Sequence, residues 1–221
     1  MKKTLLFTFN FLLVLTISAQ SLLPNKYGFK IGVNQSNIQT IPKEGIKEPE
    51  TFSKIGLCGG FYMQIPLNDK WYIIPELLYS QKGATFDYKY VHNYNINQRD
   101  EYSTTNDLTL SYLEINPIIS YKASNKLGLN IGPSVSYLIS SEYSYNENPE
   151  NILLTEGIFT EEVIDAGLNI GISYYITEDL LLDTKIYSGI IKTGSLRNPI
   201  DLLSEESSFN IRNKGFSLTI A

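Results

Sequence analysis

Few side chains in this sequence are of the types that perform catalysis, and they are scattered. His92 is the only histidine, so a Ser–His–Asp site would have to use it. It lies in a segment rich in Tyr and Asn, where no strand end places a Ser or Asp beside it, and we expect an exposed loop histidine. Cys58 is the only cysteine, and no metal-ligand spacing is present. The sequence therefore predicts a protein that is not an enzyme and holds no cofactor.

Three lysines and four carboxylates recur in alternate positions that are otherwise small or polar. Glu76 and Glu114 could form the carboxylate pair of an acid–base site. However, lysines in other segments could neutralise both of them, and buried charges must find such partners. A structural network of ion pairs is therefore the favoured interpretation. Its predicted members are Lys30, Glu76, Lys82, Glu114, Asp165, Asp183 and Lys185.

The elements that would position these charges are β-strands, because apolar residues alternate with small or polar ones. The clearest runs cover 127–140 and 164–176, and such period-two runs are typical of strands rather than helices. Six further runs begin near residues 28, 55, 71, 112, 180 and 215, which makes eight strands.

Tight turns at 67–70, 123–126 and 177–179 separate pairs of these runs. Four longer segments are predicted to be loops, at 38–54, 89–106, 143–162 and 194–211. Short turns that alternate with long loops are typical of outer-membrane barrels, with the turns in the periplasm and the loops outside. The predicted fold is an all-β, eight-stranded antiparallel up-and-down transmembrane β-barrel.

Alternation alone does not say which face of the barrel points inward. A soluble lipid-binding barrel would turn its apolar face to the interior. Here the polar face carries many Gly and Ser and charges of both signs, which would fill a narrow interior. Aromatic residues near strand ends suit the two membrane interfaces. These are Trp71, Tyr79, Tyr121 and Tyr137. We favour the membrane barrel with a filled interior and keep the soluble periplasmic barrel as an alternative.

The N-terminus predicts export. Lys2 and Lys3 precede an apolar run that ends near Ile17, and Ala19 offers a cleavage point, so 1–19 is read as a signal peptide and 20–221 as the barrel domain. No later stretch approaches the roughly 18–20 apolar residues of a membrane helix. A net charge of −5 without a basic patch excludes a nucleic-acid partner. We expect a monomeric barrel in the lipid of the cell outer membrane.

Several segments resemble the PorT-type outer-membrane β-barrel family. They are 28–37 (GFKIGVNQSN), 60–70 (GFYMQIPLNDK), 75–83 (PELLYSQKG), 111–117 (SYLEINP), 132–137 (GPSVSY) and 165–171 (DAGLNIG). Of these, 75–83 is the most specific. The resemblance covers nearly the whole chain after the signal peptide. It implies the same fold and location, and because founding members are linked to protein secretion it implies a connection to secretion machinery.

The long loops are where we expect function. The third and fourth carry many carboxylates, which could bind a divalent cation or a basic partner or could be a solvated rim. Their apolar residues could fold over the barrel mouth or contact a partner. Candidate contact residues are Ile152, Leu153, Leu154, Phe159, Leu202 and Leu203. The leading hypothesis is a surface interaction or assembly element, with a small pore or transport protein as the alternative.

Overall fold

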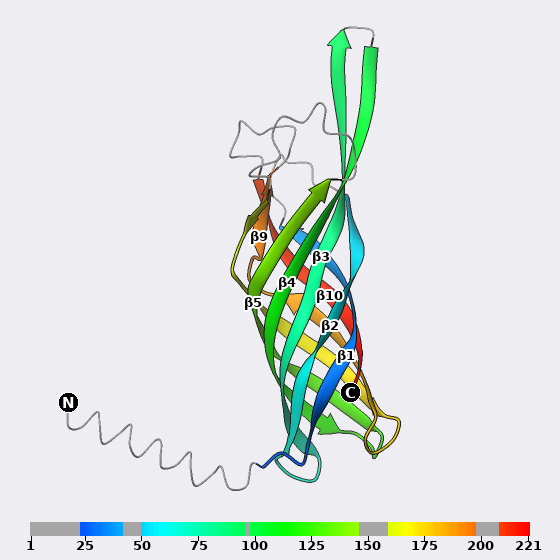
Figure 1. Cartoon of the computed structure of the whole chain (residues 1–221), viewed down its shortest axis with the longest axis vertical. Helices are drawn as coiled ribbons and strands as arrows, with labels where there is room; N and C mark the ends of the chain where they lie inside the picture. Colours follow the sequence, from blue (N-terminus) through cyan, green and yellow to red (C-terminus); the bar gives the residue numbers. More distant parts are fainter. Residues whose placement is uncertain (1–22, 42–49, 96–97, 146–158, 198–207) are drawn as a thin grey trace, which may run out of the picture.

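The computed structural model describes residues 23–41, 50–95, 98–145, 159–197 and 208–221 (Figure 1). All regular elements in these ranges are β-strands, and no helix there is long and apolar enough to cross a membrane. The strands are β1 Lys26–Ile41, β2 Glu50–Pro66, β3 Trp71–Asn95, β4 Gln98–Lys122, β5 Leu127–Tyr145, β6 Phe159–Glu161, β7 Ile164–Tyr175, β8 Leu181–Gly189, β9 Gly194–Arg197 and β10 Ser208–Ile220.

The strands form one antiparallel sheet that closes on itself. β1 pairs with β2, and pairing continues through β3, β4, β5, β7 and β8 to β10. β10 then pairs with β1 over eleven residue pairs, from Ile31↔Ile220 to Ile41↔Asn210. The short β6 and β9 pair with each other, and β9 also pairs with β10. In the sequence β6 lies just before β7, and β9 lies just after β8. The predicted eight-stranded barrel is confirmed.

Three tight turns at one end of the barrel are built by the same device. Asn68, Ser124 and Thr177 each accept hydrogen bonds on a side-chain oxygen from the backbone N–H groups two and three residues ahead, at 3.0–3.3 Å. Short polar side chains favour turns in this way because they replace a backbone acceptor. The turns therefore fix the register of the strands that follow. The end of the barrel that carries these three turns is called the turn end below.

The other end differs from the prediction, because much of the expected loop sequence is strand. The clearest error is 89–106, where β3 and β4 stay paired as far as Asn95↔Gln98. His92 lies within β3 opposite Asp100 rather than in a loop. Parts of 38–54, 143–162 and 194–211 are also strand, including β6 and β9. The reason is that tyrosine, threonine and valine in these segments favour strands as much as those in the barrel wall do.

The half of the barrel nearest the turns has the polarity of a membrane protein. Ile31 and Ile55 on the outer wall are 73% and 74% exposed, whereas Lys30 inside is 3% exposed. Trp71 packs on Tyr121 near the turns, with ring centroids 4.9 Å apart. Farther up, one row of the sheet carries Tyr79, Leu113 and Tyr137 on neighbouring strands.

The distance between these aromatic rows matches a bilayer. From residue 71 to 79, at about 3.3 Å per residue and a strand tilt of about 40°, the rows are roughly 20 Å apart in height. An outer-membrane barrel has an apolar band of about 25 Å flanked by aromatic residues. β3 continues from residue 80 to Asn95 beyond the upper row. The strands therefore rise well above the membrane.

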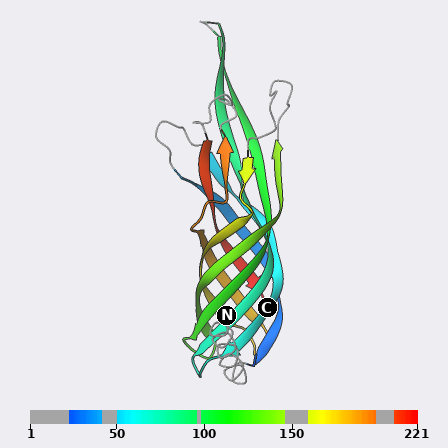
Figure 2. The same ribbon diagram turned by 90° about the vertical axis from the view of Figure 1, so that its left-hand side faces the viewer.

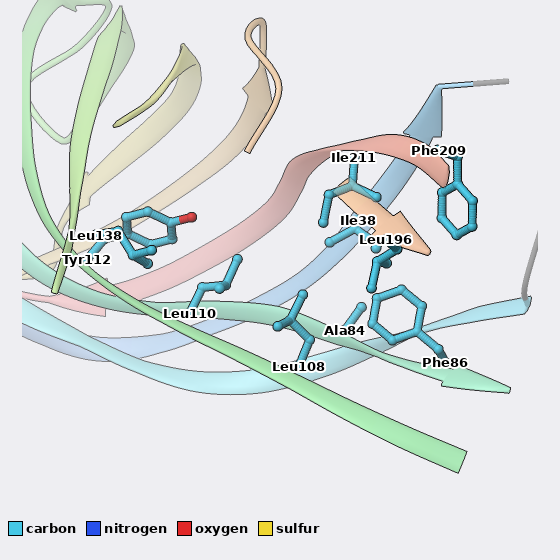
Figure 3. Close-up of a cluster of buried hydrophobic side chains, with 10 residues drawn as sticks. All are labelled: Ile38, Ala84, Phe86, Leu108, Leu110, Tyr112, Leu138, Leu196, Phe209 and Ile211. Atoms are coloured by element: carbon cyan, nitrogen blue, oxygen red, sulfur yellow. The ribbon is translucent and has the colours of Figure 1, made fainter. Parts of the chain in front are cut away.

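Above the upper row the polarity is inverted. Leu108, Leu110 and Phe86 point inward and are fully buried (Figure 3). The outer wall is polar there, and Thr85 Oγ1 donates to Asp107 Oδ1 at 2.5 Å. This half of the barrel has an apolar core and a polar, solvent-exposed surface, as a soluble protein does. One sheet thus forms two layers with opposite solvent preferences.

Candidate functional site

The barrel interior holds two groups of charges, and the lower one is a quartet of two lysines and two carboxylates. Lys30 Nζ lies 2.6 Å from Glu76 Oε1 and 2.6 Å from Asp183 Oδ2. Lys185 Nζ lies 2.5 Å from Glu76 Oε2 and 3.2 Å from Asp183 Oδ2. All four side chains are at most 7% exposed. The quartet is electrically neutral and ties β1, β3 and β8 together across the interior.

Polar neighbours complete the quartet. Asp183 Oδ1 accepts from Ser173 Oγ at 2.9 Å and from the Asn130 amide at 3.0 Å. The Asn116 amide donates to Glu76 Oε2 at 3.4 Å. Buried charges are tolerated when ion pairs and hydrogen bonds replace their water. These contacts leave Glu76 surrounded by donors, which is a structural arrangement rather than that of a free general base.

The second group lies nearer the apolar core and is centred on Lys82. Its Nζ is 2.6 Å from Glu114 Oε1 and 3.6 Å from Asp165 Oδ2. The same ammonium lies 3.8 Å from the centroid of the Tyr187 ring and 5.3 Å from that of Tyr112, within the range of cation–π attraction. Lys82 is therefore held by two carboxylates and two aromatic faces.

The interior between the two groups is almost filled. A cavity of about 40 Å³ is lined by residues of both groups and by Cys58. Such a volume holds a few water molecules at most. Cys58 is buried on the inward face, where its small side chain fills space.

An apolar cluster closes the interior above the charges. Tyr112 joins the two, because its ring faces Lys82 and its hydroxyl accepts from the Asn213 amide at 3.2 Å. Figure 3 shows side chains from six strands converging on this level. The cluster comprises Ile38, Ala84, Phe86, Leu108, Leu110, Tyr112, Leu138, Leu196, Phe209 and Ile211, with Tyr143 and Phe159 packed against it.

Beyond the cluster, β3 and β4 form a two-stranded ribbon. β2 last pairs with β3 at Glu50↔Asp87, and β5 last pairs with β4 at Tyr145↔Asn106. From there to Asn95↔Gln98 the two strands pair only with each other in the described part of the chain. Figure 2 shows the ribbon standing above the other strands. These residues, 88–95 and 98–105, are here called the ribbon, and each of its two strands has one edge that pairs with no other described strand.

Only one of the six predicted contact residues of the loops lies among the described residues. Phe159 in β6 is half-buried and packs against the apolar cluster. Ile152, Leu153, Leu154, Leu202 and Leu203 lie outside the described residues, as does the predicted signal peptide. Within the described ranges no group of three or more His, Cys, Asp or Glu could hold a metal ion.

The class of protein follows from the family that the sequence matches. Residues 19–194 match the family described as outer membrane protein beta-barrel domain. The chain belongs to this family. Its location is the outer membrane, and since the short turns of such barrels face the periplasm, the turn end is the periplasmic end.

Solved structures with a similar arrangement are distant in sequence. Neisserial surface protein A (NspA) is 14% identical, with a TM-score of 0.45, and the match covers 89% of this chain and 97% of that one. The Escherichia coli outer membrane protease OmpT is 10% identical, with a TM-score of 0.44 and coverage of 90% and 96%. The Pseudomonas aeruginosa outer membrane protein OprG is 13% identical, with a TM-score of 0.39 and coverage of 90% and 96%. No curated protein matches the chain.

Sequence reasoning missed the apolar cluster, although a signal was present. Leu108, Leu110 and Tyr112 occupy the same alternate positions as Glu114 and Asn116 farther along β4. Following that alternation without a break would have placed them inside the barrel. The strand run was predicted to begin only near residue 112, after the loop at 89–106, and this hid the change from a polar to an apolar interior.

Proposed function

We propose that this protein is a non-enzymatic surface interaction or assembly element whose working part is its outer end. The observation that carries this proposal is a closed interior beneath a projecting ribbon. Strand edges with free N–H and C=O groups can pair with a strand of a partner. The apolar residues Ile152–Leu154, Leu202 and Leu203 of the predicted loops, which lie outside the described residues, are further candidate contacts.

The alternative, a small pore, is less well supported. Conduction needs a continuous path of water, whereas the lysine–carboxylate quartet and the apolar cluster fill successive levels of the interior. Planar bilayer recordings of the refolded protein test it, and discrete conductance steps would favour the pore. The soluble lipid-binding alternative fails on the polarity of the wall, because the face that would line its cavity is the charged one.

Site-specific crosslinking tests the leading proposal. A photoreactive residue is placed in the ribbon at Tyr90, in the predicted loop at Leu153 or, as a control, on the lipid-facing wall at Ile31. In intact cells we expect a discrete crosslinked protein from the first two sites and none from the third. A component of secretion machinery among the products would support the finer proposal suggested by the PorT resemblance. Without a discrete product from either outer site, the proposal fails.

A shortened variant makes the same test without a probe. Residues 89–104 are replaced by a two-residue turn, which removes the ribbon but leaves every pair that β3 and β4 form with β2 and β5. We expect normal membrane insertion, measured by heat-modifiable gel mobility, together with loss of the crosslinked partner. Retention of the partner would assign the contact to the loops alone.

A further inference from the structure

A vestibule opens at the periplasmic end, below the charged quartet. Its volume is about 630 Å³, within the roughly 300–1,000 Å³ of small-molecule sites. The lining residues come from the ends of six barrel strands and from two of the three turns. They are Asn25, Lys26, Gln64, Tyr72, Ser120, Lys122, Asn125, Lys126, Gly128, Tyr175, Ile176, Thr177 and Glu178. Unlike the cavity between the charge groups, it has room for a ligand.

The lining is positive, although the whole chain carries a net charge of −5. Lys26, Lys122 and Lys126 face a single carboxylate residue, Glu178. Lys26 is already engaged, since it donates to the backbone oxygen of Glu178 and lies 5.7 Å from the centroid of the Tyr175 ring. Among the described residues, Lys122 and Lys126 form no ion pair. Two ammonium groups therefore remain to meet an anion.

The lysines at the strand ends belong to the inside of the barrel, not to its lipid-facing wall. Lys122 continues the inward alternation of Ile118 and Ser120, which are 1% and 4% exposed. Lys26 likewise continues the inward alternation of Lys30. Their charges consequently point into the vestibule rather than toward lipid headgroups beside the barrel.

The uncharged lining groups are also arranged as donors. Tyr175 donates its hydroxyl to Gln64 Oε1 at 3.1 Å, and this leaves the Gln64 amide nitrogen, a donor, available. Gly128 leaves space in the vestibule next to Ser120, because a Cβ added at Gly128 would lie only 3.2 Å from the Ser120 hydroxyl. The quartet above the vestibule is neutral, so it does not cancel the positive charge of the lining. Ammonium, amide and hydroxyl donors together are the chemistry that binds carboxylate or phosphate.

We propose that this vestibule binds a carboxylate or phosphate anion presented from the periplasmic side. It stands apart from the outer-end function, because the closed interior separates the two ends. The anion could be a free small molecule or the headgroup of an anionic lipid of the inner leaflet. The chemistry of recognition is the same for both, and the experiment below distinguishes them.

The test uses the ¹⁵N-labelled protein, without residues 1–19, in zwitterionic nanodiscs at low salt. Inorganic phosphate and succinate are titrated separately, and the amide signals of Gly128 and Tyr175 are followed by NMR. We expect saturable shifts with one or both anions. Lys122→Gln should weaken binding about three- to tenfold, the range for loss of one charge-assisted contact. Lys70→Gln removes an equal charge at the same end but outside the lining, and should leave the affinity within about twofold.

Two results would overturn the proposal. One is the absence of saturable shifts at the vestibule amides with either anion. The other is equal weakening by Lys70→Gln and Lys122→Gln, which would mean a diffuse charge effect. Repetition in nanodiscs with anionic phospholipid identifies the source. A lipid headgroup gives the shifts before any phosphate is added, whereas a free anion gives the same titration in both lipids. Heat-modifiable mobility verifies that each variant is folded.

Discussion

Neutralising Glu76 tests the quartet most directly. Its carboxylate is 1% exposed and lies 2.6 Å from Lys30 Nζ and 2.5 Å from Lys185 Nζ. Glu76→Gln keeps the size of the side chain but leaves two buried ammonium groups with Asp183 as their sole carboxylate partner in the quartet. The net charge of the quartet then changes from zero to +1. Removal of one partner from a buried ion pair costs about 3–5 kcal/mol, and we expect a loss of that size in the free energy of unfolding.

The assay is equilibrium urea unfolding in lipid vesicles. Trp71 is the only tryptophan and lies on the outer wall, so its fluorescence reports on the transfer from lipid to water. Asp69→Asn, in an exposed turn, is the matched control and should change stability by no more than about 0.5 kcal/mol.

A second substitution separates charge balance from simple loss of contacts. Lys185→Gln in the Glu76→Gln background restores neutrality and leaves Lys30 paired with Asp183 at 2.6 Å. The double variant should therefore lose less stability than the sum of the two single losses, by about 1–3 kcal/mol. Additive losses, or a Glu76→Gln loss below about 1 kcal/mol, would refute the buried quartet.

Three further predictions test other parts of the barrel. Phe86→Ala in the apolar cluster should cost about 3–5 kcal/mol, because it empties space in a closed core; the lipid-facing Phe29→Ala should cost clearly less in the same urea assay. Cys58 should resist a maleimide reagent in the folded barrel and react fully in urea, and rapid labelling without denaturant would show an open interior. Gly32→Ala should abolish the heat-modifiable band, because a Cβ there would lie 2.0 Å from a backbone oxygen of β10. Gly128→Ala, where the nearest atom is a side-chain hydroxyl at 3.2 Å, should retain the band.

The wall of the barrel could be predicted from the sequence because each strand repeats one local rule. Ile131 and Ile170 face lipid while Asn130 and Asn169 face inward, so alternation alone assigns both sides. The three turns were equally readable, since Asn68, Ser124 and Thr177 act within three residues of themselves. Signals of this kind need no knowledge of which strands are neighbours.

The layers of the interior could not be predicted in the same way. That Lys30 lies between Glu76 and Asp183 depends on contacts across 46 and 153 residues of sequence. The choice of Lys82 as the partner of Glu114 depends on the stagger of the closed sheet. Leu108 lies between the predicted loop at 89–106 and the strand run predicted from about residue 112, so the sequence reasoning left it unplaced. Apolar residues inside a membrane barrel also contradict the usual pattern. These inward apolar residues are explained by their height, because they lie where the strands have already left the bilayer and the outer wall faces water.

The way in which the interior is filled also sets an order of events during insertion. The quartet takes Lys30 from β1, Glu76 from β3 and Lys185 from β8, so this level is complete only when the chain is nearly finished. Once β1 has joined β10, the ribbon and its charged neighbours Asp87 and Asp107 can no longer pass through the barrel. Translocation of the β3–β4 ribbon must therefore precede closure, while the sheet is still open at the β1 and β10 edges. For this chain, pairing of β1 with β10 therefore also keeps the outer end on the cell surface.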